Sequence, residues 1–261
     1  MSVMTAPLQN FDKALFLSEY WQKKPAVFRQ VFSEFIEPVT PDELAGFALE
    51  ESVDARIITQ NKGQWQVQHG PFEEYESFGT ENWSLLVQAT NYYSTECQQL
   101  VDSFDFIPHW RREDLMISFS TIGGGVGPHL DQYDVFIVQG MGRRNWKVGS
   151  HLAVHQQDAG AGILHVDSFT PIIDDVLLPG DMIYIPPGYP HEGISLEPAM
   201  NYSIGFRAPS QIDLLSGLAD HLIQQNFTGK RFTDPDRQQN HHSAEISPQD
   251  IASLKSMLVD L

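Results

Sequence analysis

The chain has 261 residues, 41% of them hydrophobic and 19% charged, a balance typical of a globular protein with one large core or two smaller ones. Its 34 acidic residues outnumber 16 Lys and Arg, and the formal net charge of -18 disfavours direct nucleic-acid binding and favours basic partners. The single cysteine, Cys97, excludes an intrachain disulfide and a cysteine-rich metal site, and the lack of a long apolar run or a signal peptide predicts a cytoplasmic protein without a membrane segment.

Helical and extended patterns alternate in the first part of the chain, from Asn10 to about Phe78. Asn10 is predicted to cap a helix over Phe11–Lys24, which proline ends. Residues 40–43 form a capping box with proline at the first helical position, so a second helix is predicted to begin at Pro41.

Strand patterns dominate from Asp54 to about Arg207. The predicted strands are short, rich in aromatic and β-branched residues, and cover residues 56–59, 65–67, 83–87, 115–122, 135–139, 146–148, 176–178, 182–185 and 202–206. Apart from one helix predicted to be capped at Thr95, no helices alternate with them, so the crossovers of a parallel sheet are absent. We therefore predict a mainly β fold with flanking helices, an antiparallel jelly roll (double-stranded β-helix).

Helical patterns return after Pro209. Ser210 and Ser247 are each placed to cap an amphipathic helix, and the second helix runs to Leu261 without a stop signal. We therefore expect this region to be truncated or to belong to a short member of a longer family. Its apolar stripe requires a packing partner, either the jelly roll or a second copy of the chain.

Two segments carry the candidate catalytic residues. His129 and Asp131 lie two residues apart on a predicted strand edge, so their side chains point to the same face, about 7 Å apart along the strand. A tight turn in the second segment brings His191 from elsewhere in the sheet. Two histidines and one carboxylate form the ligand set of non-haem Fe(II) oxygenases, which leave the remaining octahedral positions open. The sequence therefore predicts a catalytic metal site at these three residues.

Each signal is weak by itself, because a lone histidine is more often a surface or core residue than a ligand. Residues 180–191 also match the spacing Gly-x5-Pro-x-Gly-x2-His of cupin-type barrels, which strengthens the metal interpretation. The glycine run at residues 123–127 has an alternative interpretation as a phosphate-binding loop. No predicted helix follows it and no Gly-Lys-Ser/Thr is present, so that alternative is disfavoured.

The chain resembles the bacterial JmjC-type ribosomal oxygenases over nearly its whole length. The similarity is carried by residues 114–120, 123–140 (GGGVGPHLDQYDVFIVQG), 142–149, 179–193 (PGDMIYIPPGYPHEG) and 201–209, and extends to residues 20–25 and 41–46. The resemblance implies an Fe(II)- and 2-oxoglutarate-dependent dioxygenase that uses O₂ to hydroxylate a protein side chain, with an arginine of the basic 50S ribosomal protein L16, at its carbon 3, as the implied target.

The resemblance also assigns residues and domains. It places Fe(II) on the His129, Asp131 and His191 triad and the distal carboxylate of 2-oxoglutarate on Arg144, with Arg143 facing the other way. Ser120 and Asn201 match positions that line the same pocket. It implies a JmjC-type catalytic domain over residues 1–208 and a helical, dimerisation-type region over residues 209–261, which in the family precedes a winged-helix domain. A homodimer is expected for the full-length form.

The excess of acidic residues agrees with a basic ribosomal protein as substrate. Asp134, Glu192, Tyr133 and Tyr189 lie close in sequence to the ligands, and each is a candidate for the substrate pocket or an ordinary surface or core residue.

Two other functions remain open at the level of sequence. A cupin isomerase or hydrolase would use the same barrel, but usually has a His-x-His first motif, whereas this chain has His129-Leu130-Asp131. A non-catalytic binding module would have kept the fold, although a decayed site normally loses a ligand.

Overall fold

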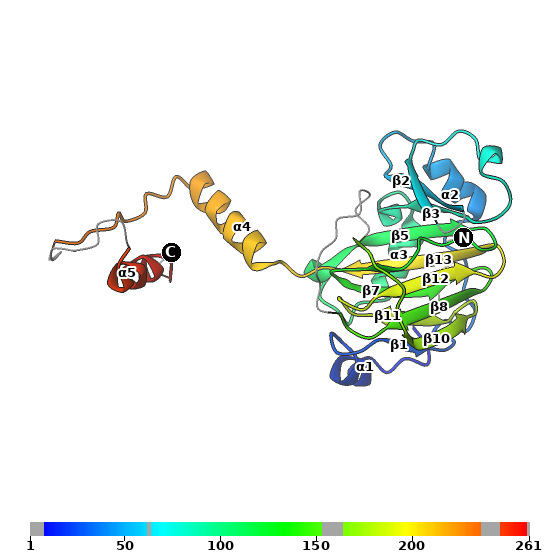
Figure 1. Cartoon of the computed structure of the whole chain (residues 1–261), viewed down its shortest axis with the longest axis horizontal. Coiled ribbons are helices and arrows are strands. Elements are labelled where there is room, and N and C mark those ends of the chain that lie inside the picture. The colour runs from blue at the N-terminus through cyan, green and yellow to red at the C-terminus, as the bar shows by residue number, and fades with distance from the viewer. Residues whose placement is uncertain (1–7, 62–63, 153–163, 236–245, 260–261) are drawn as a thin grey trace. The chain divides into compact units, whose positions relative to one another are not determined.

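Two antiparallel β-sheets make up most of the computed structural model, which describes residues 8–61, 64–152, 164–235 and 246–259 (Figure 1). The larger sheet has eight strands in the order β1 (Ala26–Phe28), β11 (Met182–Ile185), β7 (Asp134–Gln139), β13 (Ala199–Phe206), β5 (Arg112–Ser120), β4 (Trp83–Val87), β2 (Ala55–Asn61) and β3 (Gln64–His69). The smaller has the order β10 (Pro171–Leu177), β8 (Arg144–Gly149), β12 (His191–Ser195), β6 (His129–Leu130) and β9 (Leu164–His165). The predicted mainly β fold is confirmed.

By its contacts, the chain divides into two compact units, Met1–Ala208 and Pro209–Leu261. Both sheets belong to the first unit, together with the helices α1 (Lys13–Glu19), α2 (Pro41–Phe47) and α3 (Thr95–Asp102) and the 3₁₀ turns η1 (Glu76–Phe78), η2 (Thr90–Tyr92) and η3 (His109–Arg111). No helix in the described part of the chain is long and apolar enough to cross a bilayer.

The helix caps are partly those predicted. In α2 the Thr40 hydroxyl accepts from the backbone N–H of Glu43, whose carboxylate accepts from the Thr40 backbone in return, so the capping box is confirmed. The prediction that Asn10 caps α1 is wrong: the Asp12 carboxylate accepts from the Leu15 N–H instead, and the helix ends at Glu19. Asn10 has a left-handed backbone (φ 49°) and its side-chain amide donates to the Gln30 carbonyl.

The cap of α3 is also shifted, here by one residue: the Ser94 hydroxyl accepts from the Cys97 N–H, whereas the prediction placed this cap at Thr95. Cys97 itself is fully buried among apolar residues, and burial raises the pKa of its thiol.

Side chains alternate between the two faces of each strand, and the apolar ones form two clusters in the first unit. On β7, Phe136 and Val138 point outward, where α1 and α3 contribute Phe16 and Leu100. The alternate residues of the same strand point between the sheets into an inner cluster, which consists of Val135, Ile137, Trp146, Val148, Leu177, Ile183 and Ile185. Because neighbouring positions in a strand face opposite sides, one β-rich segment builds both layers.

The second unit contains two helices, α4 (Gln211–Gln224) and α5 (Pro248–Val259). Ser210 and Asp213 form the capping box of α4, and the Ser247 hydroxyl accepts from the Asp250 N–H at the start of α5, as predicted. Neither helix buries a described residue, and Ile212 and Leu215 of α4 are 74% and 62% exposed. The predicted end of the second helix at Leu261 lies outside the described residues.

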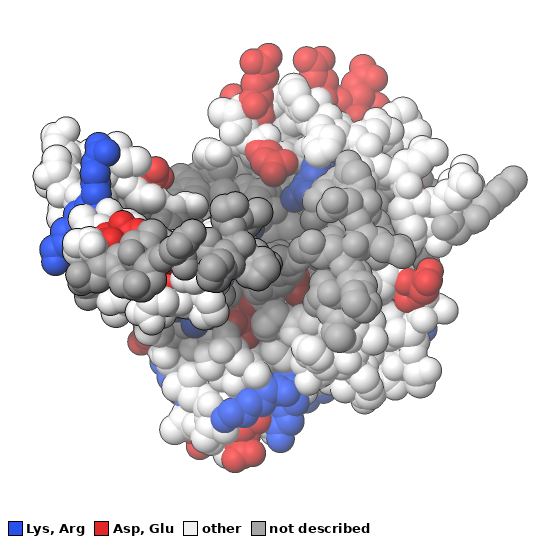
Figure 2. All heavy atoms as spheres, turned by 60° about the vertical axis from the view of Figure 1, so that its left-hand side comes forward, with Lys and Arg blue, Asp and Glu red and all other residues white. Residues whose placement is uncertain are grey.

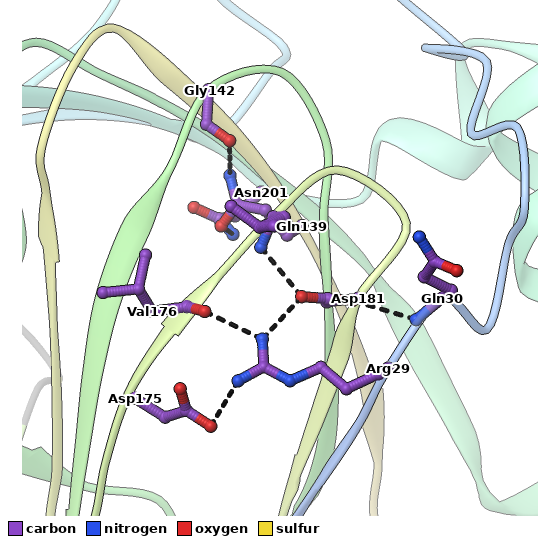
Figure 3. A network of polar contacts seen from close by, with 9 residues as sticks. Arg29, Gln30, Gln139, Gly142, Asp175, Val176, Asp181 and Asn201 are labelled. Carbon is purple, nitrogen blue, oxygen red and sulfur yellow. Dashed lines mark hydrogen bonds and ion pairs between the residues drawn. The ribbon is translucent and has the colours of Figure 1, made fainter.

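A buried carboxylate fastens the edge strand β1 to the loop between β10 and β11 (Figure 3). Asp181 has a side chain only 3% exposed and accepts from Arg29 Nη1 at 2.7 Å and from the backbone N–H groups of Gln30 and Leu178, both at 2.9 Å. Arg29 also pairs with Asp175, whose side chain is 41% exposed. The two carboxylates therefore share one arginine in different environments.

We expect Asp181→Asn to lower the free energy of unfolding by about 2–4 kcal/mol, because the amide cannot accept all three hydrogen bonds and leaves buried donors unpaired. Asp175→Asn is the matched control and should cost less than about 1 kcal/mol, since its pair with Arg29 is solvated. Urea unfolding of both variants measures the difference. Equal losses would contradict the assignment of Asp181 as the anchor.

Candidate metal centre

The structure brings the three predicted ligands together at one end of the smaller sheet. His129 begins β6, Asp131 follows that strand, and His191 begins β12, directly opposite His129 in the antiparallel register. One donor atom from each residue lies within 4.8 Å of the other two, and the imidazole centroids are 4.2 Å apart. His191 is buried, with 1% exposure, while the Asp131 side chain keeps 19%. This is the one such cluster of potential ligands within the residues that the structure describes.

Backbone hydrogen bonds set the ligand atoms of both histidines. The Nδ1 atoms of His129 and His191 lie 2.9 Å and 3.0 Å from the carbonyls of Gly127 and Tyr189, so each Nδ1–H donates and each Nε2 keeps its lone pair. Burial, and then the proximity of His191, lowers the pKa of His129 to about 4 and keeps its imidazole neutral.

The donor set fits a divalent transition metal. His191 Nε2 lies 3.5 Å from a carboxylate oxygen of Asp131, so lone pairs from an imidazole and a carboxylate face one another. A cation between such groups resolves this repulsion, and two imidazoles with one carboxylate on one side leave further coordination positions for other ligands.

Glycines make the meeting of β6 and β12 possible. The loop before His129 runs beside the end of β12, where the Gly123 N–H donates to the Ser195 carbonyl and the Ser195 N–H donates to the Gly124 carbonyl. A Cβ on Gly125 would lie 2.5 Å from the Gly193 carbonyl oxygen, so only glycine permits this approach. The glycine run therefore serves backbone packing, which agrees with the rejection of a phosphate loop.

Arg144 begins β8 and is almost entirely buried, with 5% exposure. Its Nε donates to the Ser195 hydroxyl at 3.0 Å and its Nη2 donates to the Ser120 hydroxyl. Burial lowers the pKa of Arg144 to about 10, so it remains a cation at neutral pH, yet no carboxylate pairs with it among the described residues. A buried cation without a counter-charge is costly, and an anionic ligand with two oxygens matches its donors.

The other candidate residues fall into two groups. Ser120 contacts Arg144 directly and shares a 2.7 Å hydrogen bond with the Ser84 hydroxyl. Asn201 lies on the same face of the larger sheet, because Ala199 pairs with Ser120 two residues away, but its amide donates to Gln139 at 2.8 Å (Figure 3). The buried Oδ1 of Asn201 has no partner among the described residues. Asn201 is thus not seen in contact with Arg144.

The four flanking candidates differ in where they lie. The charge of Asp131, and then burial, raises the pKa of Tyr133, whose ring packs against the inner apolar cluster and lies 5.8 Å from the Arg207 guanidinium. Asp134 faces the outer cluster, where it accepts from the Tyr184 hydroxyl at 2.5 Å and from Gln22 at 2.9 Å, so its candidacy for the pocket is wrong.

The remaining two also point away from the ligands. Glu192 alternates with the buried His191 and pairs across the strands with Lys147. The Tyr189 hydroxyl donates to the Lys23 carbonyl. Of the four, Tyr133 and Glu192 lie within the electrostatic reach of the site, since Asp131 acts on Tyr133 and the charge of Glu192 acts on His129.

Two neighbours of the site were not identified from the sequence. Ser195 holds the Arg144 guanidinium, and the Trp146 ring lies 6.1 Å from that of His191. A signal existed for both, since Ser195 is four residues after His191 and Trp146 two after Arg144, so each shares a strand face with a predicted site residue.

Comparisons with known proteins all indicate the same family. A JmjC domain model matches residues 99–214. The ribosomal protein uL16 3-hydroxylase of Escherichia coli is 52% identical over 246 residues, which cover 94% of this chain and 66% of that protein. A probable ribosomal oxygenase of Haemophilus influenzae is 34% identical over 260 residues, which cover 97% of this chain and 64% of that protein. The chain therefore spans slightly less than two thirds of the length of these relatives.

Solved structures show the same likeness. A structure of the E. coli ribosomal oxygenase YcfD in complex with cobalt and 2-oxoglutarate superposes with a TM-score of 0.89 at 50% identity, over 97% of this chain and 67% of that one. Another X-ray structure of E. coli YcfD gives a TM-score of 0.90, with 98% of this chain and 69% of that chain covered.

We expect Arg144→Met to raise the free energy of unfolding of the ligand-free protein by about 1–3 kcal/mol, because an unpaired buried cation is replaced by an apolar side chain of similar length. Arg143→Met, which breaks the solvated pair with Glu197, is the control and should change it by less than about 1 kcal/mol. Thermal and urea unfolding provide the measurement. A clear loss of stability in Arg144→Met would mean that the guanidinium serves the fold itself.

Proposed function

Because this chain belongs to the JmjC-domain family of ribosomal oxygenases, we propose that it is an Fe(II)- and 2-oxoglutarate-dependent protein hydroxylase. One observation carries the proposal: a His129, Asp131 and His191 cluster lies in the same sheet as a buried Arg144 that no carboxylate of the described residues pairs with. The first group suits a metal ion, and the second suits the far carboxylate of a dicarboxylic acid. The related E. coli YcfD has been solved in complex with cobalt and 2-oxoglutarate and in complex with cobalt and succinic acid.

In this proposal the chain's own residues position and hold the reactants. His129 Nε2, His191 Nε2 and an Asp131 oxygen bind Fe(II), and the carbonyls of Gly127 and Tyr189 keep both imidazoles in the required tautomer. Arg144, oriented by Ser120 and Ser195, binds the distal carboxylate of 2-oxoglutarate. Asn201, whose Oδ1 has no partner within the described part of the chain and which lies on the same face as Ser120, lines the co-substrate pocket.

Bound iron supplies oxidative chemistry, in which O₂ and 2-oxoglutarate are converted to succinate, CO₂ and a hydroxylated C–H position of the substrate. The apolar inner cluster, with Trp146 and Val148 beside His191, excludes water from this space. Burial and steric confinement would hold only the bound substrate residue next to the metal site, so the contribution of the protein is positioning.

We further propose an arginine of ribosomal protein uL16, hydroxylated at carbon 3, as the target. The E. coli relative is named as a uL16 3-hydroxylase, and the net charge of -18 favours encounter with a basic protein. Figure 2 shows Asp and Glu side chains in several groups over one face of the molecule, with fewer Lys and Arg. Tyr133 follows Asp131 by two residues, and its ring already faces a cation, the Arg207 guanidinium, at 5.8 Å.

For the Pro209–Leu261 unit we propose the role of a dimerisation region. The support is the exposure of the apolar stripe of α4, on which Ile212, Leu215 and Leu218 are 74%, 62% and 42% exposed. Such a stripe is stable in water only when another apolar surface covers it.

We expect His191→Ala to weaken metal binding by more than about a hundredfold and to abolish hydroxylation, since loss of residues that merely orient ligands already costs roughly 10- to 100-fold. His69→Ala, at an exposed histidine of β3, is the control and should behave like the wild type. Mn(II) titration, succinate release and a mass gain of one oxygen atom on a uL16 peptide are the measurements.

The same assay separates the alternatives. Metal binding without succinate release or peptide modification would favour a binding module. Turnover of another substrate without consumption of 2-oxoglutarate would favour a cupin isomerase or hydrolase. Full activity of His191→Ala would exclude the proposed metal site.

We expect the KM for the basic peptide to rise roughly tenfold between about 50 and 300 mM NaCl while kcat stays constant, because salt screens long-range attraction. The KM for 2-oxoglutarate should change much less, since Arg144 is buried and poorly screened. Steady-state kinetics at several salt concentrations tests this, and a peptide KM independent of salt would argue against recognition by charge.

A further inference from the structure

The indole N–H of Trp146 is buried and has no hydrogen-bond partner among the described residues. Trp146 is 5% exposed, and a buried indole N–H normally finds an acceptor. Trp83 shows the usual arrangement: it is also buried, and its Nε1 donates to the Gly79 carbonyl at 2.9 Å. The unmet donor of Trp146 is therefore an exception that calls for a physical explanation.

Trp146 lies between the two halves of the proposed site. It stands on β8 two residues after Arg144, on the same face of the strand. Its ring lies 5.7 Å from the guanidinium carbon of Arg144 and 6.1 Å from the His191 ring. A molecule that reaches from the metal ligands to Arg144 must pass close to this indole.

The opposite strand holds the indole in that place. Gly193 pairs with Trp146 across β8 and β12, between His191 and Ser195. A Cβ on Gly193 would lie 2.8 Å from Cζ2 of the indole, so the absence of a side chain there lets the ring rest on the strand. The ring is thus packed on one side by backbone and flanked by the Arg144 guanidinium, which leaves little freedom to turn the N–H toward another acceptor.

We propose that the Trp146 indole N–H binds the distal carboxylate of 2-oxoglutarate together with Arg144, and so helps the site to select a dicarboxylic co-substrate. The inference rests on the proposed function. A carboxylate offers about four lone-pair positions, more than one guanidinium fills. A buried N–H without an acceptor destabilises the ligand-free protein. A ligand carboxylate at that end would accept from it and remove this penalty, so the interaction favours ligands with a carboxylate there.

The test compares Trp146→Phe with wild type in the full 261-residue chain loaded with Mn(II) under anaerobic conditions. Phenylalanine keeps an aromatic ring and removes the N–H. We expect affinity for 2-oxoglutarate to fall about tenfold or more, the effect of losing one hydrogen bond to a charged group. Affinity for oxalate, which chelates a metal but has no distal carboxylate, should stay the same. Isothermal titration calorimetry measures both ligands.

Thermal stability gives a readout independent of turnover. The Tm of ligand-free Trp146→Phe should equal or exceed that of the wild type, because an unpaired buried donor is removed, while the Tm increase on adding 2-oxoglutarate should shrink. Trp83→Phe is the matched control. It removes the hydrogen bond from Trp83 Nε1 to the Gly79 carbonyl, so its Tm should fall, whereas its affinity for 2-oxoglutarate should equal that of the wild type.

The outcomes separate the two levels of the proposal. Wild-type affinity for 2-oxoglutarate in Trp146→Phe, or equal weakening of 2-oxoglutarate and oxalate, would overturn the role of the indole N–H and leave the proposed function standing. Failure of the wild-type chain to bind 2-oxoglutarate with Mn(II) present would overturn both.

Discussion

The pairing of β6 with β12 is the constraint on which the site depends. It sets His129 directly opposite His191, and the carboxylate of Asp131 follows within reach of the same point. Backbone alone achieves this approach, because Gly125 packs against the Gly193 carbonyl without room for a Cβ. Two histidines that are 62 residues apart in the chain are thereby held at a ring separation of 4.2 Å.

The interior of the jelly roll holds polar groups for which the described residues provide no partner. Arg144 lacks a counter-charge, and Trp146 Nε1 and Asn201 Oδ1 lack partners among the described residues. A core selected only for stability would have apolar residues at such positions, because buried unpaired polar groups are costly. Their presence on facing sheets indicates a space preorganised for a polar ligand, at the expense of stability in the ligand-free state.

The outer layer supports this interior without taking part in the chemistry. Aromatic residues of α1 and of the larger sheet pack on the far face, where Asp134 is held by Tyr184 and Gln22. Asp181 ties β1 to the loop before β11, and its backbone carbonyl accepts from the Gln139 N–H, whose side chain in turn holds Asn201 (Figure 3). A continuous polar chain thus links the surface arginine Arg29 to the inner face of the barrel.

Local patterns in the sequence were sufficient to predict most elements and to select His129, Asp131 and His191, which the structure brings together. Strand periodicity, capping residues and the spacing of His129 and Asp131 depend on neighbours within a few residues, so β4 and β11 were predicted with their exact bounds, whereas Arg144 was assigned by the family resemblance. The period of two also showed which residues share a face, and therefore that Arg143 and Arg144 diverge.

Tertiary structure alone decided which strands meet, and with them the partners of each site residue. Asp134 was a pocket candidate by its position in the sequence, yet it turns to the outer cluster because its carboxylate finds Tyr184, 50 residues later in the chain. Ser195 meets Arg144, and Trp146 rests on Gly193, through the pairing of β8 with β12. Such contacts join strands whose register is set by the packing of the whole barrel, and no local pattern contains that information.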